Sequence, residues 1–102
     1  MVKYKQIYLK SLGYTLNDFI CCEISGKPAI DIHHIVGRGR GGVDRIENLM
    51  ALTRELHIKL GDKQKYMFKL IVTHRQFLED NGVKFDNNYF NELLKKYEDY
   101  TN

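Results

Sequence analysis

Two adjacent histidines, His33 and His34, follow a short apolar run and directly precede a loop of glycine and arginine in the stretch DIHHIVGRGRGG. The pattern AIDIHHIV predicts an extended strand over Ala29–Val36. Neighbouring side chains on a strand point to opposite faces, so two imidazoles placed there cannot serve the same function. The glycines that follow allow positive φ and a close approach of backbone to a ligand. The stretch predicts a strand that carries two histidines with different roles to the start of a polar loop.

The next segments predict a second strand and two helices. Leu49–Leu52 (LMAL) is a short apolar run that favours a strand. Thr53 is the expected N-cap of a helix formed by RELHIKL, since its hydroxyl can accept a bond from a first-turn amide. Asp62 is expected to cap a longer amphipathic helix that ends at Asn81 and Gly82. We expect His74, on the apolar face of that helix, to serve packing or to lie on the helix surface.

Two flanking helices complete the predicted elements. Val2–Leu12 has the spacing of a short amphipathic helix and stops at Gly13, a typical C-cap. A last helix over about Asn88–Tyr97 places four apolar side chains on one face: Phe90, Leu93, Leu94 and Tyr97. Short strands followed by helices favour an α+β fold.

Length and composition indicate one cytoplasmic domain. The chain has 102 residues with 43% hydrophobic content, which suits one compact domain with a modest core. Its N-terminus has lysines every few residues in place of the apolar region of a signal peptide, and no window approaches a membrane span. The two cysteines, Cys21 and Cys22, are sequence neighbours and therefore poor disulfide partners, which fits a reducing compartment.

Positive charge is concentrated in the middle third of the chain, although the formal net charge is only +3. Arg38 and Arg40 lie in the glycine loop, where guanidinium groups can hold phosphates. The alternative for this loop is a solvated, flexible segment. Weaker candidates for phosphate contact are Arg45, Arg54 and Lys59, since a positive helix face is often only a soluble surface.

The stretches CEISGKPAIDIHHI and ENLMALTRELH together resemble the HNH endonuclease family, whose ββα-metal (His-Me finger) motif has two strands, an intervening loop and a helix. The resemblance covers about residues 20–61 of a single domain spanning 1–102, and residues 62–102 would form a C-terminal helical extension. It implies an α+β fold with a ββα-metal core, an N-terminal helix and two C-terminal helices.

The resemblance assigns a role to each residue of the motif. His33 and His57 would bind one divalent metal ion, compatible with Mg²⁺, Mn²⁺, Ni²⁺ or Zn²⁺. His34 would be the general base that activates water, since a neutral imidazole accepts a proton near neutral pH. Asn48 would orient either the imidazole of His34 or the loop backbone. The expected reaction is hydrolysis of DNA to 5′-phosphate and 3′-hydroxyl ends.

The chain departs from the family at the structural zinc site. Many relatives carry two Cys-x-x-Cys pairs, whereas the corresponding positions here are Cys22, Ser25, Thr53 and Leu56. Four thiolates are needed for such a site, so no structural zinc is expected. We expect apolar packing to replace the metal in this turn, with Ile24, Leu52 and Leu56 among the packing residues.

Two other functions remain open at this level. One is a nucleic-acid-binding module that has lost turnover, against which the complete set of His33, His34, Asn48 and His57 argues. The other is an auxiliary subunit that acts with a larger DNA-processing partner, which the short chain favours; a homodimer is a further alternative. Small stand-alone proteins of this family are common in phages and prophages, which suggests a phage-encoded protein in the host cytoplasm.

Overall fold

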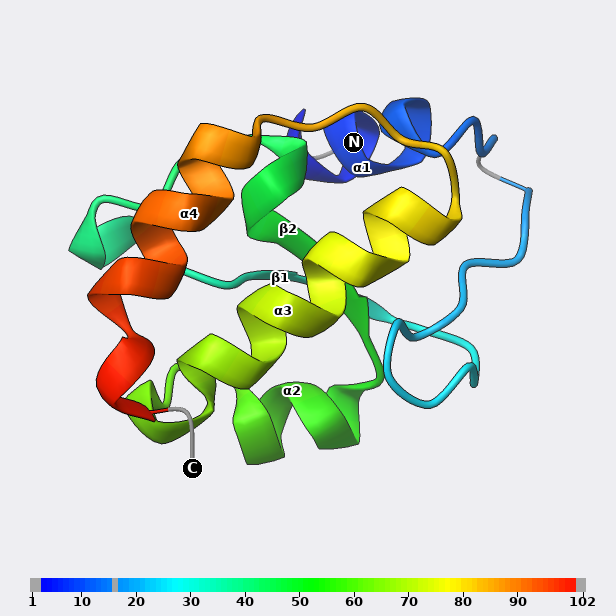
Figure 1. The fold of residues 1–102 in the computed structure, drawn as a ribbon. Helices are drawn as coiled ribbons and strands as arrows, with labels where there is room; N and C mark the ends of the chain where they lie inside the picture. The colour runs from blue at the N-terminus through cyan, green and yellow to red at the C-terminus, as the bar shows by residue number, and fades with distance from the viewer. Residues whose placement is uncertain (1–2, 16, 101–102) are drawn as a thin grey trace.

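The computed structural model describes residues 3–15 and 17–100 and has an α+β fold (Figure 1). An N-terminal helix and a two-stranded antiparallel sheet are followed by three further α-helices. The elements in chain order are α1 (Lys3–Ser11), β1 (Asp31–His34), β2 (Leu49–Leu52), α2 (Arg54–Leu60), α3 (Gln64–Asp80) and α4 (Asn87–Lys96). Three short 3₁₀ turns lie between or after them: η1 (Arg38–Arg40), η2 (Ile46–Asn48) and η3 (Glu98–Tyr100).

The sheet pairs the two predicted strands, and its register places His33 opposite Met50 and His34 opposite Leu49. The strand prediction for Leu49–Leu52 is confirmed. The prediction of Ala29–Val36 for the first strand is too long, because β1 contains only Asp31–His34. The chain bends away after His34, where the Asn48 side chain, in place of a partner strand, bonds both backbone groups of Val36.

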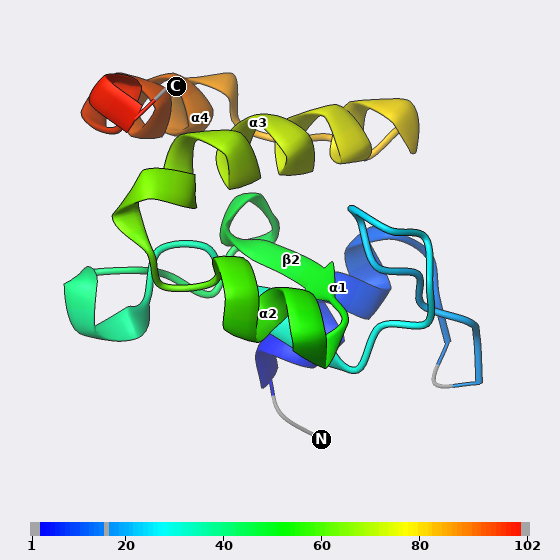
Figure 2. The same ribbon diagram turned by 90° about the horizontal axis from the view of Figure 1, so that it is seen from below.

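β2 is buried on both of its faces, and this places it between two layers of helices. Met50 and Leu52 belong to the main core with residues of α3 such as Leu70, whereas Leu49 and Ala51 pack with Tyr8 of α1. Figure 2 shows α3 and α4 side by side in one layer, with the sheet, α1 and α2 below them. β1, in contrast, is partly exposed at three of its four residues, so functional side chains on it remain reachable.

The helix boundaries confirm most of the predicted caps. Gly13 has φ +73°, and the amide of Tyr14 bonds the carbonyl of Leu9 at 2.8 Å, the pattern expected when glycine ends a helix. The Thr53 hydroxyl accepts the amide of Leu56 at 3.2 Å, as predicted. The prediction that Asp62 caps α3 is wrong. Asp62 has a left-handed φ of +59°, and the N-cap position is occupied by Lys63, whose side chain makes no capping bond.

A buried polar network, rather than apolar packing alone, holds the turn that follows Cys22. The Glu23 carboxylate accepts bonds from the Tyr8 hydroxyl at 2.6 Å and the Ala51 amide at 3.2 Å, and lies 2.6 Å from Nδ1 of His74. Burial and the nearby carboxylate raise the pKa of Tyr8, so its hydroxyl remains a donor. The expectation of an apolar replacement for zinc is therefore incomplete: Leu52 and Leu56 pack in the core as predicted, whereas the prediction for Ile24 is wrong, because its side chain is exposed.

His74 is not a surface residue, and it does more than fill the core. It is 0% exposed, and its Nε2 lies 2.6 Å from the carbonyl oxygen of Ile46. Both ring nitrogens face oxygen acceptors, so whichever nitrogen carries a proton donates a hydrogen bond here. His74 thereby ties α3 both to the turn after Cys22 and to η2.

In the parts of the chain that the structure describes, we find no helix with the length and apolar character needed to cross a membrane.

We predict that Glu23→Ala lowers the free energy of unfolding by about 3–5 kcal/mol, because removing one partner leaves a buried group without compensation. Urea denaturation followed by circular dichroism measures this. Glu92→Ala, at an exposed position of α4, is the matched control and should change stability by less than about 0.5 kcal/mol. Equal unfolding free energies for the two variants would show that the network does not stabilise the fold.

Candidate functional site

A pocket of about 320 Å³ lies beside β1 and brings together three of the four histidines. Its lining comes from α1, β1, the glycine loop, α2 and the turn after α2: Tyr4, Ile32, His33, His34, Gly37, Arg38, His57 and Asp62. The sequence-predicted residues His33, His34 and His57 therefore share one concave site. Asn48 does not line this pocket and acts on the loop beside it.

His33 and His57 meet across the contact between β1 and α2. Their ring centroids are 4.6 Å apart, with an angle of 54° between the ring planes. His33 is only 3% exposed, and its Nε2 is a buried atom without a hydrogen-bond partner in the described chain. Burial, and secondarily the charge of His57, lower the pKa of His33 from 6.5 to about 4. The ring is consequently neutral at pH 7 and has a lone pair available for a ligand.

The ring of His57 is oriented by an aspartate on β1. Its Nδ1 lies 2.9 Å from the carboxylate of Asp31, and Arg54 binds the same carboxylate through two nitrogens at 2.9 and 3.1 Å. Hydrogen bonding to Arg54 is the main cause that lowers the pKa of Asp31, so the carboxylate is charged and accepts a proton donated by Nδ1. A neutral His57 then has its free lone pair on Nε2, the arrangement seen when a carboxylate orients a metal-binding histidine.

Asp31 was not predicted as a site residue from the sequence. The available signal was its spacing: Asp31 and His33 are two residues apart on one strand, so their side chains lie on the same face.

Gly61 allows the two rings to come together. A Cβ at this position would lie 2.4 Å from the carbonyl oxygen of His57, 2.9 Å from its Cδ2 and 3.1 Å from Cε1 of His33. Any larger residue would push α2 or the two rings apart. The position one turn after His57 is therefore sterically reserved for glycine in this chain.

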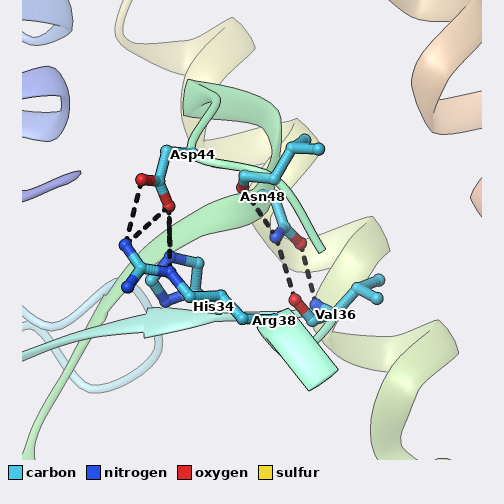
Figure 3. A network of polar contacts seen from close by, with 6 residues as sticks. His34, Val36, Arg38, Asp44 and Asn48 are labelled. Atoms are coloured by element: carbon cyan, nitrogen blue, oxygen red, sulfur yellow. Dashed lines mark hydrogen bonds and ion pairs between the residues drawn. The ribbon is translucent and has the colours of Figure 1, made fainter. Parts of the chain in front are cut away.

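His34 points to the opposite face of β1, toward α1. Its ring makes an edge contact with Tyr4, with centroids 4.7 Å apart, and its Nε2 lies 2.8 Å from Oδ1 of Asp44. Figure 3 shows the Asp44 carboxylate bonded to both the His34 ring and the Arg38 guanidinium. Tyr4 and Asp44 were not predicted as site residues from the sequence.

Asn48 supports the loop backbone and not the imidazole of His34. It is fully buried, its Oδ1 accepts the amide of Val36 at 2.8 Å, and its Nδ2 donates to the carbonyls of Val36 and Val43 at 3.0 Å (Figure 3). One side chain thus fastens both ends of the glycine loop. Asn48 was expected to orient either the imidazole of His34 or the loop backbone, and its observed contacts are with the loop backbone.

The five basic residues proposed to contact nucleic acid fall into two groups. Three are engaged by carboxylates: Arg38 by Asp44, Arg54 by Asp31, and Arg45 by Glu47 and Asp86. The side chains of the other two, Arg40 and Lys59, are exposed and have no ion-pair or hydrogen-bond partner in the described chain.

Arg45 is held away from the pocket. Its guanidinium lies over the ring of Tyr89 in α4, 5.0 Å from the ring centre, and bridges the η2 and α4 carboxylates. These contacts support a structural function that joins the sheet to the C-terminal helices.

Among the described residues, no cluster of three or more His, Cys, Asp or Glu side chains is arranged to hold a metal ion. Comparisons of the chain with protein-family models, with curated proteins and with solved structures gave no match. The case for a particular chemistry therefore rests on the motif residues and their geometry.

We predict that the metal-free protein loses stability as the pH falls from about 6.5 to about 4, the two limits being the ordinary and the folded-state pKa of His33. In this window the unfolded chain binds the proton and the folded chain does not, so each pH unit lowers stability by up to about 1.4 kcal/mol. Urea denaturation across this range measures the effect. His33→Gln removes the titrating group and should have a shallower slope. An equal slope in both proteins would contradict the prediction.

Proposed function

We propose that the protein is a metal-dependent HNH endonuclease that hydrolyses phosphodiester bonds of DNA, with β1, β2 and α2 as its ββα-metal core. The observation that carries the proposal is the meeting of His33 and His57 beside a pocket that also contains His34. A buried imidazole nitrogen without a partner is costly in a core, and it is rare unless a ligand uses it.

The donor set fits a divalent metal ion. His33 is neutral at pH 7, and the contact of His57 with Asp31 directs the lone pair of the neutral ring to Nε2. Imidazole pairs suit Zn²⁺ and Ni²⁺, and water or phosphate oxygens in the remaining positions would also admit Mg²⁺ and Mn²⁺. When bound, the ion would offset negative charge on the phosphate and on the departing 3′ oxygen.

His34 is the proposed general base. It would take a proton from water, whose oxygen then bonds to phosphorus as the bond to the 3′ oxygen breaks; the 3′ oxygen takes a proton from solvent. The products are a 5′-phosphate and a 3′-hydroxyl. Asn48 keeps the loop after β1 closed by binding Val36 and Val43, and so holds the pocket wall on which substrate would rest.

DNA is the proposed substrate, and Arg40 and Lys59 are the proposed phosphate contacts. Both are exposed and unpaired in the described chain, whereas Arg45 and Arg54 are engaged by carboxylates. Arg38 lines the pocket, and its guanidinium is ion-paired with Asp44. Its proposed contact with substrate is therefore limited to the pocket wall. The principal electrostatic contribution to binding is thus assigned to two residues instead of five.

We predict that metal-stripped protein nicks supercoiled plasmid once Mg²⁺, Mn²⁺, Ni²⁺ or Zn²⁺ is restored. His34→Ala should lower the rate by at least about 10²-fold while metal binding persists, since a general base contributes about that much. His57→Ala should lose metal binding, measured by titration calorimetry, and activity together.

Asn91→Ala, at an exposed site on α4, is the control and should cleave like wild type. If wild type and all variants are inert with every metal on duplex, branched and single-stranded DNA, the isolated chain is not a nuclease. In that case the non-catalytic binding module or the auxiliary subunit becomes the better explanation. Equal activity in every variant would indicate a contaminating nuclease.

We predict that the double variant Arg40→Ala/Lys59→Ala binds duplex DNA more weakly and with a flatter salt dependence. Each lost phosphate contact should reduce the slope of log K against log salt by about 0.9. Fluorescence anisotropy at several salt concentrations measures both quantities. The variant Lys84→Ala/Lys95→Ala removes the same charge from exposed positions near and on α4 and should leave the slope unchanged. Equal slopes in the two double variants would argue against the assigned contacts.

A further inference from the structure

The position of Asp44 determines which nitrogen of His34 carries a proton. Oδ1 of Asp44 lies 2.8 Å from His34 Nε2. Hydrogen bonds from His34 and then from Arg38 lower the pKa of the Asp44 carboxyl, so this group is charged and only accepts. Nε2 must therefore donate. In the neutral ring, which has one N–H, the lone pair is on Nδ1.

Two further side chains hold this pair in place. Arg38 reaches both oxygens of Asp44, with Nη2 at 3.0 Å from Oδ1 and 2.9 Å from Oδ2. Tyr4 contacts the edge of the His34 ring, and the Arg38 guanidinium lies 5.2 Å from the centre of the same tyrosine ring. The imidazole is thus restrained by a hydrogen bond at one nitrogen and by an aromatic ring from α1.

Asn48 sets the position of Asp44 along the loop. Its amide group binds the carbonyl of Val43, the residue directly before Asp44, and the backbone of Val36, two residues after His34. Because both ends of the loop are fixed to one side chain, the carboxylate returns opposite the imidazole (Figure 3).

We propose that Asp44 is a positioning residue for the reaction, which fixes the tautomer and orientation of His34 so that Nδ1 is the atom that takes the proton from water. The proposal deepens, and for its catalytic consequence rests on, the proposed nuclease function. It assigns Arg38 to the support of Asp44, a different role from phosphate binding.

Two substitutions separate the hydrogen bond from the charge. Asp44→Leu removes the acceptor at similar size. Asp44→Asn keeps one oxygen, and that oxygen should take the Oδ1 position, because Oδ1 faces His34 Nε2 and two nitrogens of Arg38 whereas Oδ2 faces one. The asparagine variant should therefore retain the wild-type tautomer. Asp44 lies in a partly exposed loop, and amide-region NMR spectra verify that both variants are folded.

The decisive measurement is a long-range ¹H–¹⁵N correlation spectrum of the histidine rings at a pH where His34 is neutral. Wild type and Asp44→Asn should show His34 with the proton on Nε2, and Asp44→Leu should show a mixture of tautomers or the proton on Nδ1. An unchanged His34 pattern in Asp44→Leu would overturn the proposal. This readout does not require turnover, so it decides the role of Asp44 even if the nuclease proposal fails.

Kinetics test the catalytic consequence. Asp44→Leu should lower kcat about 10²-fold, the scale of general-base catalysis, with KM and metal affinity unchanged, while Asp44→Asn should lose less than about tenfold. A tautomer change without a fall in kcat would overturn the positioning role. A rise in KM alone would also contradict it, because that result would make Asp44 and Arg38 part of substrate binding.

Discussion

The rest of this small fold depends on the hydrogen bonds made by the buried carboxylate of Glu23. Two strands of four residues cannot stabilise themselves in water, so the sheet needs helices fixed to both of its faces. Glu23 lies at that junction, since its oxygens contact Tyr8 of α1, the backbone of β2 and His74 of α3. Through its second nitrogen, His74 also holds the carbonyl of Ile46 in η2, the 3₁₀ turn that ends at Asn48. The network therefore positions the start of β2, and with it the residue that closes the glycine loop.

The pocket depends on the alternation of β1. His34 contacts α1, while Asp31 and His33 lie beside α2, and both histidines line the same pocket. One four-residue strand thus supplies the proposed base and a proposed metal ligand to one site. A longer strand would not serve, because the chain must turn at Val36 to bring the loop and Asp44 back over His34. Asn48 makes this turn by taking the backbone bonds that a longer ladder would have used.

Local signals in the sequence were sufficient for the strand Leu49–Leu52, the Thr53 cap and the α+β class, because each depends on neighbouring residues. The proximity of His33 and His57 was expected through the family resemblance. Sequence patterns did not reveal the pairing of Glu23 with His74, which are far apart in the chain and meet only after the helices pack. The same applies to Arg45 and Arg54, whose positive charge was visible in the sequence but whose partners, Asp86 and Asp31, were not. Asp62 had the residue type of a cap but a left-handed backbone.

Two Arg–Asp–His networks of the same type orient two of the pocket histidines. Arg54 binds Asp31, which faces Nδ1 of His57; Arg38 binds Asp44, which faces Nε2 of His34. In each network the hydrogen bonds from the histidine and the arginine keep the carboxylate charged, and the carboxylate fixes the proton on one ring nitrogen and so frees the other. The two histidines are bound through different nitrogens, so their free atoms differ as well, Nε2 in His57 and Nδ1 in His34. His33 has no such partner in the described chain, and burial is the main cause of the lowered pKa that keeps it neutral. Arg38 and Arg54 thus act first on the protonation of the pocket histidines, and of the five basic residues predicted to contact nucleic acid, Arg40 and Lys59 are the two whose described side chains stay exposed and unpaired.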